Sequence, residues 1–364
     1  MKKLLRCRPA VGILAWVLLL PVLPAQAGVI ADLYQVVEAV PSRGASDRAE
    51  ASARGLARVF VRVTGEAKVG ASSQLQPLLA RAQQYVQSYR YEVEDNQLYV
   101  HLSFDPSAIS TQVRELQLPT WPNNRPDTLV WLAVDTIRQG RSALGEQDAP
   151  ELYAALEAAA VERGLPVEFP AMDQSDRRNL PVGNLWAQDE RTAQSASLRY
   201  GSDATLMGRL LEVSEQRWQG DWLLIHGGRS YAYDTQGASL EEAARQGIGG
   251  AADLLAERYA VQTGGAGHKS DVVLELSGVD SFAKYTAASA YLQGLAQASS
   301  AELIAVDGDR LRFALTVSVS MRSLRDALAL NHRLTAEDEA DPIDLVGYRA
   351  PLGSSENPLH YRWR

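Results

Sequence analysis

Cysteine is nearly absent from this chain of 364 residues, which contains a single one, Cys7. The residues after it can therefore form no disulfide and supply no thiolate to a catalytic or zinc site. Histidine is also scarce, and the five histidines share no metal-ligand spacing with one another or with nearby carboxylates. We expect no metal site, no cofactor, and a fold that depends on burial of apolar side chains. The histidines are His101, His226, His268, His332 and His360.

Sequence motifs of the common enzyme classes are missing as well. No Gly-x-Ser-x-Gly motif supports a nucleophilic serine. Gly-Ile-Gly-Gly at 247–250 lies inside a helical pattern without a following Lys-Ser or Lys-Thr, so it indicates close helix packing or a kink rather than a phosphate loop. Glu92 and Glu94 share a strand face, as a glycosidase pair could, but a solvated hairpin explains them without catalysis. The sequence predicts no catalytic residue and leaves open an active site assembled from different parts of the chain.

Long apolar runs are limited to one, which lies near the amino terminus. Four basic side chains precede an apolar run from Ala10 to Leu23, and Pro-Ala-Gln-Ala follows as a cleavage site. The run is too short for a comfortable membrane span, and Cys7 lies upstream of it, where a lipid-anchoring cysteine does not occur. We predict a signal peptide over residues 1–27, cleavage between Ala27 and Gly28, and a mature protein in the bacterial periplasm.

Positive charge is in deficit. The chain has 36 Lys and Arg residues against 44 Asp and Glu, a formal net charge of −8, and loss of the four basic residues of the signal changes it to −12. Because no block of Lys or Arg occurs, nucleic acids and anionic membrane surfaces are poor partners. We also expect no integral membrane segment after residue 27.

Hydrophobic periodicity divides the rest of the chain into three α+β or α/β modules. The N-terminal module, at 28–118, is predicted to have the order β-α-α-β-β-α, with its long helix opening at a capping box, Asp47-x-x-Glu50, and ending at Gly65. The middle module, at 128–263, is predicted to be a three-layer α/β unit with an antiparallel edge. In it we expect a long hairpin turned by Gly220-Asp221 and a polar loop at 184–186.

Segments rich in proline or glycine separate the modules. A Pro-rich linker at 119–127 precedes the middle module, and a Gly-rich joint at 264–270 precedes the C-terminal module at 271–334. The C-terminal module is predicted to have a β-α-β-β-α order, with Asp307-Gly308 as the turn of its hairpin. The residues at 335–364 are predicted to form an extended tail.

The long helix of the first module has two predicted faces. Apolar residues at spacings of three and four form a core-facing stripe, and three arginines form a second stripe, on which Glu50 is placed to pair with Arg54. We expect Phe60→Ala to cost about 3–5 kcal/mol, and Arg62→Ala to cost little because Arg62 is predicted to project toward solvent or an acidic neighbour. The apolar stripe is Ala49, Ala53, Leu56, Phe60 and Val63.

Six residues are candidate interaction sites. The arginines of the second stripe could recognise carboxylates or phosphates, although a solvated helix face paired with local acids also explains them. Tryptophans in loops, at strand ends and in the tail could anchor glycans or partner proteins, although packing between modules is their commoner use. The candidates are Arg54, Arg58, Arg62, Trp121, Trp186 and Trp363.

One segment carries a family resemblance: Arg48-x-Glu50-Ala51 followed by residues 55–65, which end in Val-Arg-Val-Thr-Gly. It resembles a family of gammaproteobacterial exported proteins catalogued as a domain of unknown function, and the 184–186 segment and the βαββα module look similar as well. This resemblance implies a periplasmic location and no known catalytic residues. The three-module layout is similar to that of the periplasmic flagellar assembly protein T, and the middle module is similar to the amino-terminal domain of the Tol-system translocation protein B.

Three classes of function remain as hypotheses. The leading one is a non-enzymatic periplasmic protein that binds or scaffolds another component of the cell envelope, with a protein as the expected partner. A periplasmic hydrolase would need titratable groups from different modules in one pocket. A small-ligand- or glycan-binding protein would have a deep cleft between the first and second modules.

Overall fold

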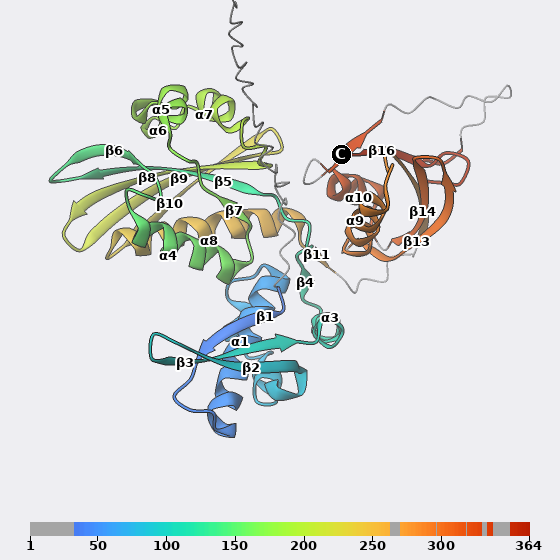
Figure 1. Ribbon diagram of the computed structural model, residues 1–364, viewed down its shortest axis with the longest axis horizontal. Coiled ribbons are helices and arrows are strands. Elements are labelled where there is room, and N and C mark those ends of the chain that lie inside the picture. Colours follow the sequence, from blue (N-terminus) through green and yellow to red (C-terminus); the bar gives the residue numbers. More distant parts are fainter. Residues whose placement is uncertain (1–32, 263–269, 296, 318, 330–332, 338–349) are drawn as a thin grey trace, which may run out of the picture.

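A computed structural model describes residues 33–262, 270–295, 297–317, 319–329, 333–337 and 350–364. The predicted signal peptide and most of the predicted Gly-rich joint lie outside these residues. Figure 1 shows three modules: the N-terminal one in blue, the middle one in green and yellow, and the C-terminal one in orange and red. The predicted mixed α/β architecture is confirmed. Among the helices described, none combines the length and the apolar character that crossing a membrane requires.

The N-terminal module is an antiparallel sheet with a long helix on one face. Its strand order is β1-β3-β2, and α1 packs against the face that carries Val36, Val100, Leu102 and Phe104. The opposite face carries Val37, Arg90 and His101 in one cross-strand row. The elements are β1 (Gln35–Ala39), α1 (Ala45–Thr64), η1 (Val69–Ala71), α2 (Gln76–Leu79), η2 (Ala82–Tyr85), β2 (Val86–Glu94), β3 (Gln97–Phe104) and α3 (Pro106–Glu115).

Helix α1 ends where the sequence predicts but begins earlier. Gly65 has a φ of 77°, and its N–H donates to Val61 O, so the glycine stop is confirmed. The predicted capping box is wrong, because Gly44 is the N-cap and no side chain caps the helix. Asp47 instead accepts a hydrogen bond from Ser42 Oγ at 2.5 Å. Asp47, the acidic residue of the first turn, is therefore bound by Ser42 in the loop before the helix and does not cap the helix.

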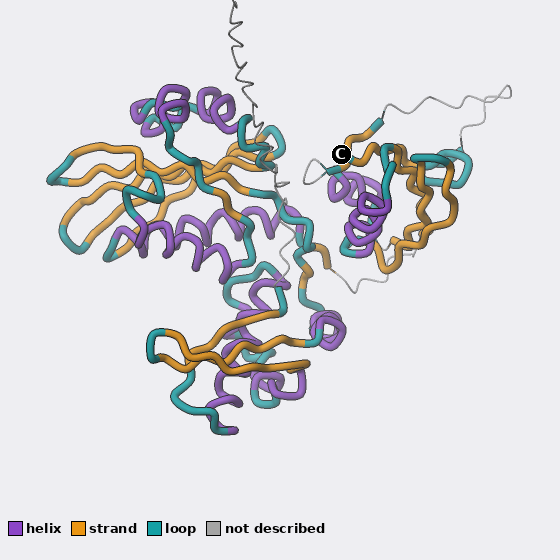
Figure 2. Tube along the Cα trace, in the orientation of Figure 1, coloured by secondary structure: helices purple, strands orange, loops and turns teal. Residues whose placement is uncertain are grey.

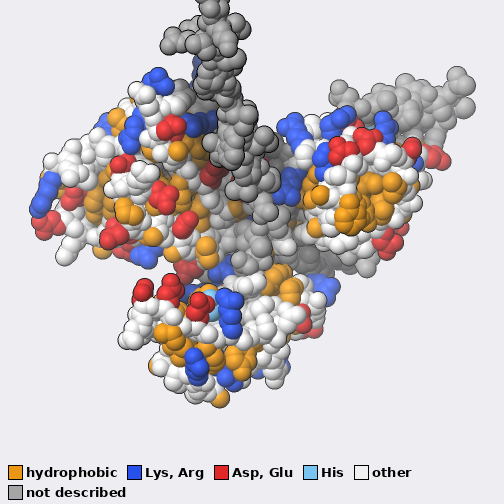
Figure 3. Space-filling view, in the orientation of Figure 1, with side chains coloured by type: hydrophobic (Ala, Val, Ile, Leu, Met, Phe, Trp, Pro, Cys, Tyr) orange, Lys and Arg blue, Asp and Glu red, His pale blue; other side chains and the backbone are white. Residues whose placement is uncertain are grey.

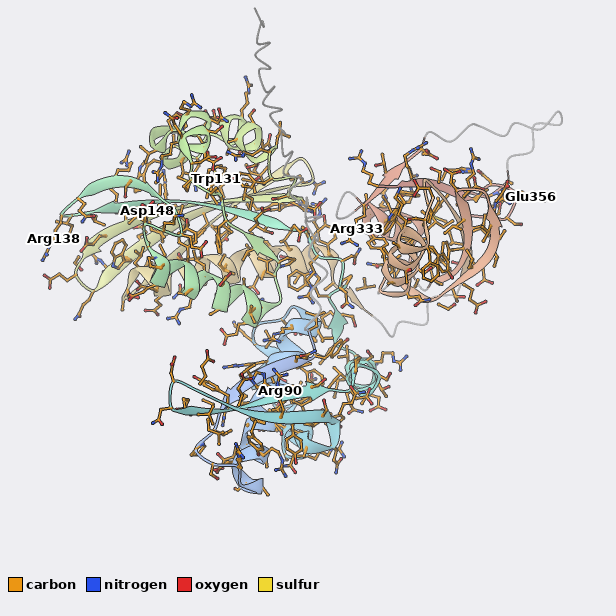
Figure 4. All side chains as sticks on the ribbon, in the orientation of Figure 1. Arg90, Trp131, Arg138, Asp148, Arg333 and Glu356 are labelled. Atoms are coloured by element: carbon orange, nitrogen blue, oxygen red, sulfur yellow. The ribbon has the colours of Figure 1, made fainter. Side chains whose placement is uncertain are left out.

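The middle module has three layers, and Figure 2 shows its strands between two layers of helices. The strand order is β10-β9-β8-β5-β6, with β7 beside β5; β5 is parallel to β7 and β8, and the other pairs are antiparallel. Helices α4 and α8 cover one face, and α5, α6 and α7 cover the other, above Trp131 (Figures 1 and 4). The elements are β5 (Thr128–Thr136), β6 (Gly140–Leu144), α4 (Pro150–Arg163), β7 (Val167–Glu168), α5 (Gln174–Asn179), α6 (Val182–Trp186), α7 (Glu190–Ser197), β8 (Ala204–Ser214), β9 (Arg217–His226), β10 (Arg229–Gly237) and α8 (Leu240–Tyr259).

The predicted hairpin of the middle module is wrong in its turn. Gly220 and Asp221 lie in the interior of β9, and the chain turns instead at residues 215–216 and at Gly227-Gly228. Gly220 serves packing, because a Cβ there would lie 2.7 Å from Trp222 Nε1. Gly227 and Gly228 have φ values of 57° and 70°, which suit a tight hairpin turn. The apparent hairpin is therefore three strands.

The predicted polar loop at 184–186 is also wrong, because these residues belong to α6. Pro181 precedes the helix, and Leu185 is fully buried against the sheet. A helix of five residues with one core side chain is too short to show a periodic pattern. Its existence depends on tertiary burial rather than on local sequence.

Two glycines in α8 should respond in opposite ways to alanine. A Cβ at Gly247 would lie less than 3.0 Å from the indole of Trp222, whereas the nearest atom to a Cβ at Gly249 is Arg163 Nη1 at 3.6 Å. We expect Gly247→Ala to lower the free energy of unfolding by about 2 kcal/mol through overpacking. Gly249→Ala should raise it by up to about 1 kcal/mol through helix propensity. Urea denaturation of both variants tests this, and equal effects would contradict it.

The C-terminal module is a sheet with two helices. Its strand order is β13-β14-β12-β16-β15, and α9 and α10 contribute to the core beneath it. The predicted β-α-β-β-α order is confirmed, and Gly308, with a φ of 62°, lies in the hairpin turn as expected. The elements are β12 (Ser270–Ser277), α9 (Phe282–Gln293), β13 (Ala298–Asp307), β14 (Arg310–Val317), α10 (Met321–Leu328), β15 (Leu334–Ala336) and β16 (Leu359–Trp363).

The predicted extended tail is wrong at its end, because β16 lies inside this sheet. It pairs in parallel with β12 and antiparallel with β15. Leu359, Tyr361 and Trp363 are buried and alternate with His360 and Arg362. This alternation is the usual signal of a half-buried strand. The acidic stretch from 338 onward lies outside the described residues.

Candidate functional site

The first two modules meet at a fully buried arginine, Arg125, in the linker. Its Nη1 donates to Gly164 O at 2.6 Å, beyond the end of α4, and its Nη2 donates to Arg62 O at 2.5 Å, in the last turn of α1. Its guanidinium also lies 3.9 Å from the ring centre of Trp121. Cations stabilise helix carboxyl ends, whose carbonyls lack partners within the helix. Arg125 therefore joins α1 to α4 through the carbonyls of both.

Further contacts make the linker a packed junction. Arg163 Nη2 donates to Gly65 O at 2.9 Å and to Asp253 Oδ1 at 2.6 Å. On the other side, Asn124 Nδ2 donates to Ala327 O of α10 at 3.0 Å. A short pair of strands, β4 (Pro119–Thr120) and β11 (Val261–Gln262), adds backbone hydrogen bonds at the same place. The linker thus contacts all three modules.

A groove of about 1200 Å³ opens between the N-terminal and middle modules beside this junction. One wall is the face of the N-terminal sheet that α1 does not cover, and the other is α4 with the segment that follows it. Arg58 and Arg62 also line the groove. The sheet wall consists of Gln35, Val37, Ser88, Arg90, His101 and Ser103.

The helix wall is mainly apolar where a solvent-facing helix is usually polar, although the exposed Glu157 also lines it. Ala154, Ala158 and Val161 are exposed on one face of α4, at spacings of four and three, and Val161 is 61% exposed. The opposite face of α4 contributes Leu156 to the core of the middle module. Across the groove, Val37 is 48% exposed. Apolar residues on both faces of α4 are the sequence signal that could have identified this wall.

The sheet wall is polar, and its histidine is engaged on both ring nitrogens. His101 Nε2 lies 2.9 Å from Glu92 Oε2, and Nδ1 lies 3.3 Å from Arg90 Nη2. Because a guanidinium can only donate, Nδ1 accepts, and we assign the ring proton to Nε2. Ser88 and Ser103 lie one cross-strand row away, but within the described chain no hydrogen bond joins either to His101. The hydrogen bonds of His101 are thus made to Arg90 and Glu92, and Figure 4 labels Arg90 on this sheet.

Two of the three candidate arginines bond to carbonyls along the free edge of β1. Arg54 Nη2 donates to Ala39 O at 3.2 Å, and Arg62 Nη1 donates to Gln35 O at 2.6 Å. Arg54 and Arg58 both pair with the buried Glu38, so the predicted Arg54–Glu50 pair is wrong. Arg62 was predicted to project toward solvent or an acidic neighbour; it does not project into solvent, because this side chain is buried. The carbonyls of the strand edge attract the guanidinium groups, which a helix pattern alone does not show.

The candidate tryptophans have different surroundings. Trp121 is buried in the core of the middle module, and Trp363 is buried in the C-terminal core beside Tyr291. Trp186 is half-buried, with the Arg141 guanidinium 4.0 Å from its ring centre. Of the three, Trp186 is thus the one that retains exposed surface. The groove brings together Arg58 and Arg62 from the six candidates and none of the tryptophans.

Metal ligation has no cluster to support it in the part of the chain that the structure describes. No group of three or more His, Cys, Asp or Glu residues lies close enough there to hold an ion. His268 and His332 lie outside the described residues.

Comparison with known proteins identifies one domain. A family described as "Domain of unknown function (DUF8605)" matches residues 27–122, which include the N-terminal module. No curated protein matches the chain. A solved structure described as "Crystal structure of uncharacterized protein" is similar at 12% sequence identity, with a TM-score of 0.17, and the similarity covers 37% of this chain and 92% of that chain.

Proposed function

We propose that the protein is a non-enzymatic binding protein of the bacterial periplasm, and that its groove holds an amphipathic segment of another envelope protein. The exposed apolar face of α4, formed by Ala154, Ala158 and Val161, carries this proposal. An apolar surface of this kind, rimmed by polar groups, is typical of an interaction site. A segment with one apolar and one polar side would match the helix wall and the sheet wall together.

The junction supports this function because it fixes both walls before a partner arrives. Arg125 bonds to carbonyls at the ends of α1 and α4, and Arg163 bonds to Gly65 O and Asp253. A preformed groove reduces the entropy lost on binding. The small side chains Ala154 and Ala158 also allow the backbone of an incoming segment to approach closely.

The periplasmic part of the proposal is supported by sequence. Residues 1–27 have the basic start, apolar run and small-residue cleavage site of an exported precursor. The matching domain family begins at residue 27, beside the predicted cleavage site. The only cysteine lies within the segment that cleavage would remove.

Photocrosslinking in cells tests this function. A photoreactive residue at Ala158 should give a discrete adduct in the fraction released by osmotic shock, and mass spectrometry should identify it as an envelope protein. Val161→Asp places a charge on the apolar wall and should remove the adduct. Ile137→Asp is the matched control, because Ile137 is 67% exposed in the turn between β5 and β6.

Two outcomes would contradict the proposal. The first is the absence of any adduct from the groove, and the second is an adduct that Ile137→Asp removes as completely as Val161→Asp does. A small molecule that raises the melting temperature of the protein, but not that of the Val161→Asp variant, would instead assign the groove to a small ligand.

A further inference from the structure

A second surface, independent of the groove, lies at the edge of the C-terminal sheet. Within the described residues β13 pairs with β14 alone, so its other edge presents unpaired backbone N–H and C=O groups. Three large apolar side chains on this strand are exposed: Leu303 by 37%, Ile304 by 52% and Val306 by 61%. Figure 3 shows hydrophobic side chains gathered on this module. Natural proteins usually protect such edges with charges, proline or very short strands.

Two other edges in the same chain have that protection. Arg54 and Arg62 occupy the outward carbonyls of β1. At the opposite edge of the C-terminal sheet, β15 is only three residues long. In contrast, β13 has ten residues and a Leu-Ile-Ala-Val run at 303–306. Its pairing with β14 shifts register within this run, between Leu303 and Ala305, which brings Leu303 and Val306 to the same face of the sheet. Its length and its apolar run distinguish β13 from these two edges.

The register shows what an added strand would contact. Leu303 lies opposite Phe313, and Val306 lies opposite Leu311, and both partners are buried in the C-terminal core. Cross-strand partners share a face of the sheet. Leu303 and Val306 thus extend the core-facing side of the sheet beyond Phe313 and Leu311. A further strand on β13 would cover these two side chains and pair with the free backbone groups.

The charge at this edge defines the kind of strand. Glu302 and Asp307 flank the apolar run, both are exposed, and neither forms an ion pair among the described residues. The nearby Arg310 and Arg312 are directed to Glu275, at 3.4 and 2.7 Å. The edge therefore presents apolar surface with acidic ends. Complementary charge in a partner would steer association and exclude acidic strands.

We propose that β13 is a docking edge that accepts an extended segment of another protein, with valine- or isoleucine-like residues alternating with lysine or arginine, as an added antiparallel strand. The main-chain hydrogen bonds supply affinity in this mode, and the alternating side chains supply specificity.

A peptide experiment tests the docking edge. The probe is a fluorescein-labelled peptide of alternating lysine and valine, and its binding to the mature chain is measured by fluorescence anisotropy. Two peptides serve as controls: one with glutamate in place of lysine, and one with the same charge in which two valines are replaced by proline. We expect binding of the lysine–valine peptide alone, with amide hydrogen exchange slowed at 303–306.

Matched variants separate the edge from general charge attraction. Val306→Lys should weaken binding at least tenfold, whereas Val93→Lys, at a 60% exposed valine of β2, should leave it unchanged. Equal weakening by both variants, equal binding of the proline peptide, or protection outside β13 would overturn the proposal. A dimer of the chain that Val306→Lys dissociates would assign the edge to a second copy and also overturn it.

Discussion

Replacing Arg125 with methionine should lower the free energy of unfolding by about 4 kcal/mol, because it leaves buried carbonyl groups without a donor. The guanidinium is fully buried and donates to carbonyls of Arg62, Trp121, Pro122, Arg163 and Gly164. Burial, together with the charges of Arg62 and Arg163, lowers the pKa of Arg125 to about 9, so the group is still charged at neutral pH. Urea denaturation followed by tryptophan fluorescence measures the loss.

Two further variants define what Arg125 contributes. Arg138→Met is the control, because Arg138 is exposed at the tip of the β5–β6 hairpin (Figure 4), and it should change stability by less than about 0.5 kcal/mol. Arg125→Lys keeps the charge but not the planar fork that reaches both helix ends, so it should recover only part of the loss. Equal, small losses from Arg125→Met and Arg138→Met would show that the two modules are held together by other contacts.

The groove depends on this junction, so the same variant has a functional consequence. Arg125 and Gly164 lie at the end of α4, and Gly164, Leu165 and Pro166 line the groove. Loosening the junction should therefore reduce crosslinking from Ala158 even below the unfolding transition. In contrast, the docking edge of β13 lies in a separate core and should keep its peptide affinity.

Regular periodicity allowed much of the fold to be predicted. The stop of α1 at Gly65 and the hairpin around Gly308 were both expected from local pattern. Each has a signal within a few residues, a glycine at positive φ.

What the sequence did not show depends on contacts distant along the chain. Gly220 has the composition of a turn, but it is required by Thr235 and Trp222, which fill the space where a side chain would go. Arg125 stands between prolines in a segment with the composition of a loop, and only the convergence of α1 and α4 gives it partners. The groove has the same origin, because its walls come from residues 35–103 and 154–167. No local pattern joins such segments.

Phe60→Ala should lower the free energy of unfolding by about 3–5 kcal/mol, because it leaves a cavity in the N-terminal core. Phe60 is fully buried among the residues that α1 and the sheet share, as its position on the apolar stripe predicted. Urea denaturation of the mature chain measures the loss. A small loss would mean that the core collapses around the missing ring.

Arg62→Ala, two residues away, distinguishes the structure from the helix pattern. The pattern predicted a small effect, but Arg62 is buried and its Nη1 donates to Gln35 O at 2.6 Å, so we now expect a loss of about 1–3 kcal/mol. Arg54→Ala is the matched control on the same stripe; its side chain is half exposed, and it should cost less than about 1 kcal/mol. Equal losses from Arg62→Ala and Arg54→Ala would place Arg62 in solvent. In that case Arg62 would not protect the edge of β1, and the contrast between that edge and the open edge of β13 would be lost.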